Sequence, residues 1–207
     1  MRITFTLGLL IAISINCSNP RTPTIKEEAN FDLKSPDLNS IIKLYRSLDK
    51  EVEYVHKTDT TRLELYLQID EKSQVKRVLH FSDTIVRYFK SYNLIKNKSG
   101  QIIYVLEAPG CESGDWELFY ENYFDRDGNL VVFIRKCRFF NAECADPAIE
   151  ESVYYYNLKH ELIKKTYKIM DDNGKILDLT KCSIDYRFDY KKYTTVTEYS
   201  KGHKLKK

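Results

Sequence analysis

A long amphipathic pattern opens the part of the chain with regular periodicity. Between residues 35 and 55, apolar side chains recur at steps of three and four, the spacing of one helical face. Ser35 and Pro36 suit the cap and first turn of a helix, and Asp37 suits the positive end of its dipole. The pattern predicts one long helix that lies on another element. Its apolar stripe consists of Leu38, Ile41, Ile42, Tyr45, Leu48, Val52 and Val55.

Alternating runs predict the surface beneath this helix. The segment RLELYLQI, residues 62–69, alternates polar and apolar positions, which is the period of a β-strand. Further β-rich runs occupy residues 74–81 and 84–92, and we expect the last strands over 183–190 and 192–199. These runs are too short and too closely spaced for a helical bundle.

A turn motif recurs between the remaining strands. A polar Asp, Asn or Lys cluster precedes Gly100, Gly128 and Gly174, and each glycine is followed by one polar residue and an apolar run. A fourth copy has His160 at the glycine position. Glycine supplies the positive φ that hairpin turns require, so the four positions are predicted to be hairpin tips. Their uneven spacing favours a meander over a solenoid.

Together these patterns predict an α+β fold that is mainly β. We expect an antiparallel β-meander sheet of eight to ten strands with one N-terminal amphipathic helix packed on it. The single domain is predicted to span residues 37–200, followed by a basic tail at 201–207.

An apolar run precedes the domain. Arg2 is followed by a stretch rich in Ile, Leu and Phe that extends to Ile15. A membrane-spanning helix needs about 20 apolar residues. The shorter run, with its positive charge on the N-terminal side, is typical of a secretory signal peptide, here residues 1–16.

The end of the run specifies the class of signal. An apolar segment that stops at Ser14-Ile15-Asn16-Cys17 resembles the lipobox of bacterial lipoprotein precursors. Ser14 stands where that class usually has leucine, and Asn16 where it usually has glycine or alanine. The resemblance implies cleavage before Cys17, acylation of its sulfur, and attachment to the membrane through the acyl chains. Ser18 is compatible with the sorting of this class to the outer membrane. Ordinary signal-peptidase cleavage nearby is the alternative.

Residues 17–36 are predicted to be a flexible tether between the anchor and the domain. Prolines and charges dominate this segment, and it lacks the apolar surface needed to order itself. Two or three acyl chains on Cys17 hold a protein stably, whereas one holds it marginally.

Composition adds few constraints. The 207 residues include 33 Lys and Arg against 30 Asp and Glu, a formal net charge of +3. This balance predicts no nucleic-acid partner. The sixteen tyrosines and ten phenylalanines fit strand packing better than ligand stacking, because only one tryptophan and no basic stripe accompany them.

Four cysteines remain when Cys17 carries lipid. In an oxidising compartment they favour at least one disulfide over zinc, because no closely spaced Cys or His pair is present. The candidates are Cys111, Cys137, Cys144 and Cys182. The expected strand pairing favours a Cys111–Cys144 bridge, with Cys137–Cys144 as the alternative. No metal and no cofactor is expected.

The remaining candidates for chemistry are weak. The acidic turns at Gly128 and Gly174 lack the first and last carboxylates of an EF-hand loop, so we interpret them as turns. A thiol nucleophile at Cys111 would need His80 or His160 nearby. No local catalytic motif supports that pair.

The sequence therefore favours a non-catalytic exported lipoprotein of the cell envelope, a binding or structural module with a possible envelope protein partner. The alternative is a periplasmic inhibitor or immunity-type protein that uses loops 108–115 and 138–150. A hydrolase with a Cys111 thiol is less favoured. In a eukaryotic secreted protein, Asn97 would instead be a glycosylation acceptor.

Overall fold

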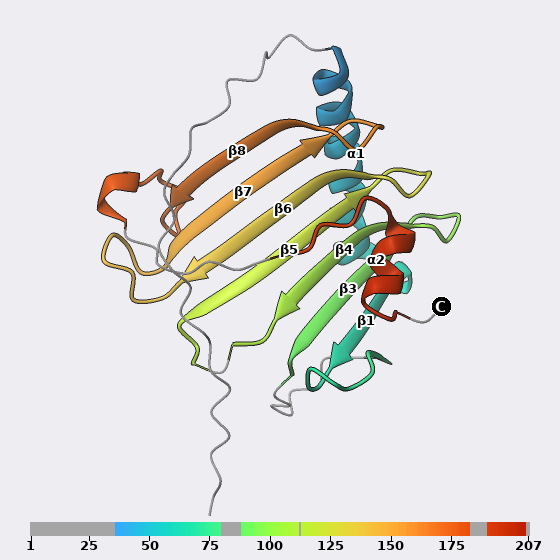
Figure 1. Ribbon diagram of the computed structural model, residues 1–207, viewed down its shortest axis with the longest axis horizontal. Coiled ribbons are helices and arrows are strands. Elements are labelled where there is room, and N and C mark those ends of the chain that lie inside the picture. Colours follow the sequence, from blue (N-terminus) through green and yellow to red (C-terminus); the bar gives the residue numbers. More distant parts are fainter. Residues whose placement is uncertain (1–35, 80–87, 112, 183–189, 206–207) are drawn as a thin grey trace, which may run out of the picture.

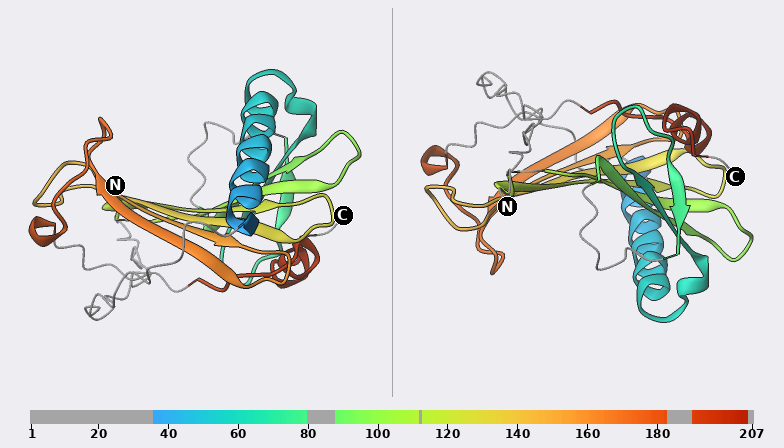
Figure 2. Two further views of the ribbon diagram at one scale, coloured as in Figure 1. Left: turned by 90° about the horizontal axis from the view of Figure 1, so that it is seen from above. Right: turned by 90° about the horizontal axis from the view of Figure 1, so that it is seen from below.

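The computed structural model describes residues 36–79, 88–111, 113–182 and 190–205 (Figure 1). Within these residues, eight strands form one open antiparallel sheet. Helix α1 (Pro36–Thr58) crosses one face of the sheet, and the short helix α2 (Val196–Gly202) lies on the opposite face (Figure 2). The mainly β, α+β class and the helix packed on a sheet are confirmed.

The sheet has the order β2-β1-β3-β4-β5-β6-β7-β8. From β3 onward, neighbours in sequence are neighbours in the sheet, as the hairpin motifs predicted. At the other end β1 lies between β2 and β3, so β2 and β8 form the two edges. The strands are β1 (Leu63–Gln68), β2 (Lys76–Val78), β3 (Lys90–Lys96), β4 (Ile102–Pro109), β5 (Trp116–Phe124), β6 (Leu130–Phe139), β7 (Ala148–Tyr156) and β8 (Leu162–Met170); single turns of 3₁₀ helix are η1 (Thr60–Arg62) and η2 (Leu179–Lys181).

The face that carries α1, here the α1 face, contains one of two large cores. The predicted helix stripe lies against it, and Val55, the last residue of the stripe, is fully buried. Burial of each such side chain contributes about 1.5–3 kcal/mol. The buried members of this core are Ile41, Leu48, Val52, Val55, Ile95, Ile103, Tyr104, Tyr123, Val131, Val132, Ile134 and Val153.

The opposite face, here the α2 face, has its own aromatic core. Successive strand residues point to opposite faces, so β5 contributes Trp116, Leu118, Tyr120 and Phe124 to this side. Tyr199 of α2 is buried in the same core. Because both faces bury apolar side chains, the strands are more apolar than those of a sheet with one wet face.

The four predicted turns are hairpin tips or turns in the structure. Gly100, Gly128 and Gly174 have φ of 83°, 82° and 79°, and His160 has φ of 62°. The polar residue that precedes each turn closes it with its own side chain. In the β5–β6 turn, Asp125 Oδ1 accepts hydrogen bonds from the backbone N–H groups of Asp127 at 2.9 Å and Asn129 at 2.8 Å.

The expectation of a strand over residues 192–199 is wrong. Residues from Val196 form α2, because the Thr195 side chain caps its first turn by accepting from the Glu198 N–H at 3.2 Å. Glu198 in turn accepts from the Thr194 N–H at 3.1 Å, which resembles a capping box. Of the other predicted strands, residues 183–189 of the one over 183–190, and parts of those over 74–81 and 84–92, lie outside the described residues.

Candidate functional site

A buried carboxylate links α2 to the sheet. Glu107 of β4 has no exposed surface. Lys90 Nζ lies 2.7 Å from its Oε1, and the Tyr199 hydroxyl donates to its Oε2 at 3.0 Å. His203 Nε2 lies 3.4 Å from the same Oε2, and His203 Nδ1 lies 3.2 Å from the Tyr92 hydroxyl. We call these five residues the Glu107 cluster. A charge buried this deeply must be paired, so the cluster fixes α2 on strands β3 and β4.

The histidine of this cluster is held in its neutral form. Burial is the main cause that lowers the pKa of His203, and the charges of Lys90 and Lys191 lower it further. Glu107 acts in the opposite direction without reversing the shift. Only 12% of the His203 side chain is exposed, because its ring packs against the rings of Tyr193 and Tyr199.

A half-buried carboxylate, Glu121 of β5, lies on the α1 face. The Tyr104 hydroxyl donates to Glu121 Oε2 at 3.1 Å, and the Tyr123 hydroxyl lies 2.9 Å from Asp49 Oδ1 and 3.3 Å from Glu121 Oε2. Burial is the main cause that raises the pKa of Glu121. Since Asp49 belongs to α1, these hydroxyls join the helix to the sheet. Tyr45 of α1 packs edge-on against Tyr123, with ring centroids 5.0 Å apart.

A third polar pair crosses the α2 face between β6 and β7. Arg135 forms a short ion pair with Glu150. Cys137, two residues farther along β6, is buried, and burial raises the pKa of its thiol far above the usual value. A protonated, buried thiol is a poor nucleophile, so we assign Cys137 to the core.

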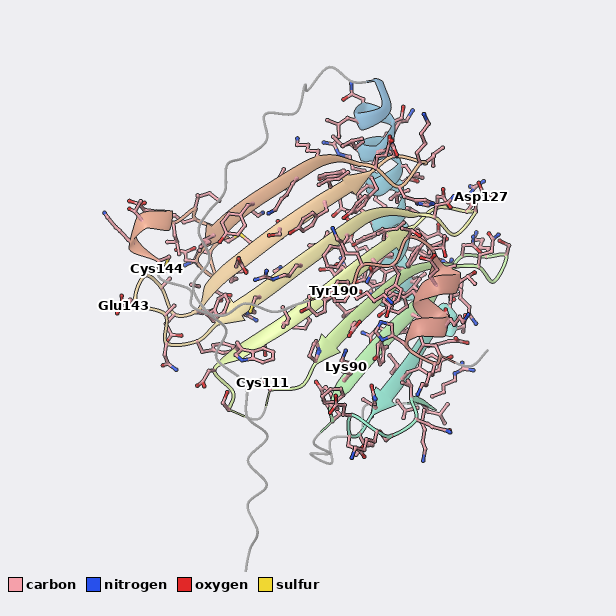
Figure 3. All side chains as sticks on the ribbon, in the orientation of Figure 1. Lys90, Cys111, Asp127, Glu143, Cys144 and Tyr190 are labelled. Atoms are coloured by element: carbon pink, nitrogen blue, oxygen red, sulfur yellow. A yellow bond between two sulfur atoms is a disulfide. The ribbon has the colours of Figure 1, made fainter. Side chains whose placement is uncertain are left out.

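The α2 face also carries exposed cations on tyrosine rings. Lys165 of β8 and Lys192 both lie over the ring of Tyr154, at 5.3 and 5.1 Å from its centroid. Lys192 also lies 5.6 Å from the Tyr156 ring, and Lys191 lies 5.2 Å from the Tyr193 ring. We call this group the lysine–tyrosine surface: Tyr154, Tyr156, Lys165, Lys191, Lys192 and Tyr193. Tyr154 of this surface packs at a tilt against Phe133, which stacks on Tyr190, and Tyr190 stacks on Tyr120 (Tyr190 is labelled in Figure 3).

The lysines of this surface differ from Lys90 of the Glu107 cluster in their partners. Lys90 is neutralised by Glu107. Lys165, Lys191 and Lys192 are exposed, and in the described part of the chain none of them forms an ion pair with a carboxylate. A cation over a tyrosine ring keeps its charge available to a ligand. The arrangement is therefore suited to binding an anionic group.

The disulfide joins Cys144 to Cys182. The prediction of at least one disulfide is confirmed, but the preferred Cys111–Cys144 pairing and the Cys137–Cys144 alternative are both wrong. Cys111 and Cys137 are free thiols on the α2 face. The long β6–β7 loop carries Cys144 away from β5 and toward the segment that follows β8, where Ala148, Ile169 and Cys182 form a small third core. Cys17 lies outside the described residues.

The structure does not bring Cys111 and His160 together. Cys111 follows the end of β4, whereas His160 lies in the β7–β8 turn, at the same end of the sheet as the turn containing Asp127 (Figure 3). The Cys111 thiol lies 3.0 Å from Ser113 Oγ. His80, the other predicted partner, lies outside the described residues. Across the described residues, no group of three or more His, Cys, Asp or Glu side chains is arranged to hold a metal ion.

Sequence reasoning missed the carboxylates of Glu107 and Glu121 and the lysine–tyrosine surface. Glu107 and Glu121 interrupt apolar strands, and a carboxylate at an interior position is a signal that could have been used. The two lysine pairs, in IKKTY and YKKY, each stand beside a tyrosine, yet nothing local indicates that they meet. The Thr195–Glu198 spacing was a readable capping signal for α2.

Comparisons with known proteins give no further guide. No family model, no curated protein and no solved structure matches the chain. Among the described residues, no helix has the length and apolarity needed to cross a membrane.

Proposed function

We propose that this protein is a lipid-anchored binding module of the bacterial cell envelope, tethered through Cys17 and non-catalytic. Its lysine–tyrosine surface is the contact surface for an anionic partner. The anchor rests on the N-terminal apolar run, the resemblance of Ser14–Cys17 to a lipobox, and the proline-rich segment before α1. The Cys144–Cys182 disulfide supports an oxidising compartment.

The observation that carries the binding role is a contrast between two sets of charges. The carboxylates of buried Glu107 and half-buried Glu121 contact partners that hold the two helices on the sheet. The cations at Lys165 and Lys192 lie exposed over tyrosine rings without a carboxylate in the described chain. A charge that an internal partner neutralises stabilises the fold, whereas an exposed lysine without a neutralising carboxylate can attract an anionic ligand.

Membrane fractionation tests the anchor. We expect Cys17→Ala to move the protein from the membrane to the soluble fraction, because the acyl chains supply the membrane affinity. Cys111→Ala is the matched control, since it also removes a thiol that forms no disulfide, and it should stay in the membrane fraction. The anchor is disproved if the Cys17 variant remains membrane-bound.

Site-specific photo-crosslinking in intact envelopes tests the surface. A photoreactive phenylalanine analogue at Tyr154 should give a discrete adduct. The same analogue at Tyr54, which is 51% exposed on α1, should give none. Adducts of equal yield at both positions, or none at Tyr154, would count against a binding role for this surface.

An inhibitor of an envelope enzyme is the second candidate. The specific observation in its favour is that the disulfide attaches the β6–β7 loop at Cys144 to Cys182, because a rigid loop binds with a smaller ordering cost. In that case replacing Cys144 by Ser would abolish inhibition of the target enzyme, while charge changes at Lys165 would not.

A further inference from the structure

Strand β8 is an edge strand with backbone groups open to a partner. It pairs with β7 on one side only, from Met170 to Leu162. The carbonyl of Ile169 accepts a hydrogen bond from the Leu177 N–H at 2.9 Å, so the backbone of Ile169 points away from β7. Backbone direction alternates along a strand. The N–H and C=O groups of Tyr167 and Lys165 therefore also point outward.

Most of this edge is uncovered within the described chain. The segment that returns alongside β8 makes a bridge between Met170 and Ile176 and ends its pairing at Ile169. From Leu162 to Lys168, no described residue pairs with the outer side of the strand. Its side chains are mostly exposed or half-buried. A long unpaired edge of this kind is a template for an added strand.

The charges along the edge select the chemistry of the partner. Lys164 and Lys165 form no ion pair in the described chain, and Lys168 pairs with Glu151 at 2.8 Å. Two acidic residues beyond the ends of the strand have other partners: Glu161 accepts from Asn157 at 2.7 Å, and Asp172 lies 2.8 Å from Arg138. Across a strand pair, opposite charges attract and like charges repel, so the edge favours a strand that carries carboxylates.

Two other occupants fit these charges less well. If two β8 strands paired in antiparallel fashion about Thr166, Lys164 of one copy would face Lys168 of the other, and parallel in-register pairing would set each lysine against itself. Lys164 lies opposite Tyr155 and shares the α1 face, whereas Lys165 lies opposite Tyr154 on the α2 face. A flat lipid surface cannot contact both faces at once, but a strand in the plane of the sheet can.

We infer that the open edge of β8 binds an extended acidic segment of a partner protein by strand addition. The outward N–H and C=O groups of Lys165 and Tyr167 supply the backbone hydrogen bonds. Lys164 and Lys165 supply charge contacts on the two faces, with Lys192 beside Lys165 above the Tyr154 ring. The inference rests on the proposed binding function and adds the partner's conformation and charge.

Amide hydrogen exchange with defined peptides tests strand addition directly. The probe is a blocked peptide of alternating glutamate and valine, added to the folded, full-length Cys17→Ala protein. It should slow exchange at the Lys165 and Tyr167 amides, while the Thr166 amide, bonded to β7, changes little. A glutamate–proline peptide has the same charge but lacks half of the backbone donors, and a lysine–valine peptide has the opposite charge. Neither should protect these amides.

Two substitutions separate the backbone and charge contributions. Lys165→Pro removes only an outward N–H, so it should abolish protection at Tyr167, whereas Lys165→Ala keeps the N–H and should bind within a few-fold of the original protein. The alternating peptide presents its glutamates on one face of the sheet. The double variant Lys164→Glu, Lys165→Glu reverses the charge on both faces, so it should weaken binding by about tenfold or more whichever face the glutamates occupy. Circular dichroism checks that each variant is folded, and the exchange measurement on the unsubstituted sequence stands without them.

Four outcomes would overturn the inference. They are equal protection by the glutamate–proline peptide, no protection by the glutamate–valine peptide, protection of Lys165 and Tyr167 already present in the free protein, and protection by vesicles of anionic phospholipid instead of the peptide. The third outcome would mean that this chain or a second copy occupies the edge. Membrane release of the Cys17→Ala variant is independent of all four, so failure of the edge leaves the anchored-module proposal separately testable.

Discussion

The buried hydroxyl of Tyr199 offers a sharp test of how α2 is held on the sheet. Tyr199→Phe removes one oxygen from a side chain that is fully buried and leaves the ring in place against Phe124 and Tyr193. The lost contact is the 3.0 Å hydrogen bond to Glu107 Oε2. The buried carboxylate then keeps Lys90 as its close partner on the other oxygen.

The expected cost follows from the charge on the acceptor. A hydrogen bond to a charged group contributes about 1.5–3 kcal/mol, and a buried acceptor left without its donor adds to the loss. For a domain of this size, 1 kcal/mol shifts the melting temperature by about 2–4 °C. We therefore expect Tyr199→Phe to lower the melting temperature by about 3–12 °C. Local opening of α2 should increase more than global unfolding.

Denaturant unfolding and amide exchange across α2 measure both effects. Tyr193→Phe is the matched control: Tyr193 is half-buried on the same segment and its hydroxyl makes no hydrogen bond to the described residues. It should cost less than about 0.5 kcal/mol. If the two variants lose equal stability, or if Tyr199→Phe loses none, the Glu107 cluster does not hold the helix and our account of the α2 face is wrong.

Three further predictions concern the turns, the buried histidine and the disulfide. His160→Gly should raise the melting temperature and His160→Val should lower it, because left-handed backbone at φ 62° costs a non-glycine residue about 1–2 kcal/mol; equal values would contradict this. Burial lowers the folded-state pKa of His203, so below about pH 6.5 the unfolded chain binds a proton that the folded chain does not. Urea unfolding should therefore show stability falling as the pH drops from about 7 to 5, with a smaller slope in His203→Gln. Reduction of Cys144–Cys182 should cost about 2–4 kcal/mol, whereas Cys111→Ser should change stability little, and a reversed order in thermal melts would refute the assignment.

The elements that the sequence predicted are those set by local chemistry. Helix α1 was recognisable because its apolar positions repeat within one face, and the turns were recognisable because a positive φ restricts the residue type. His160 is the clearest case, since only its place in the repeated motif indicated a left-handed conformation, and the structure has φ of 62° there.

The elements that the sequence mispredicted depend on contacts between distant segments. Residues 192–199 have strand-like composition, but the Thr195 cap and burial of Tyr199 beneath the aromatic core select a helix. The disulfide prediction failed for a related reason. It relied on the expected pairing of β5 with β6, and that pairing contains no information on the distant Cys182, which is the true partner of Cys144.

The candidate site was predictable only in outline. The sequence indicated a β-rich surface with many tyrosines, and we interpreted those rings as packing, which is correct for Tyr120 and Tyr199 in the core. It could not show that Lys165 and Lys192, well separated along the chain, meet over one tyrosine. Such a pairing depends on the path of the chain after β8, which no periodicity encodes.

The position of the charges across the sheet supports a division between structural and binding regions. Leu106 pairs with Glu121 across β4 and β5, so Glu121 and Glu107 lie at neighbouring positions on opposite faces, in the middle of the sheet. Each carboxylate accepts a hydrogen bond from a tyrosine hydroxyl. Removing a carboxylate from water costs free energy, and only surrounding hydrogen-bond partners offset that cost. Glu107 and Glu121 therefore lie where the helices cross the sheet. A ligand cannot reach those positions without displacing a helix. The β8 edge has the opposite properties, since Lys165 is exposed and the outer backbone groups are open within the described chain. A partner can bind there while both helices stay in place.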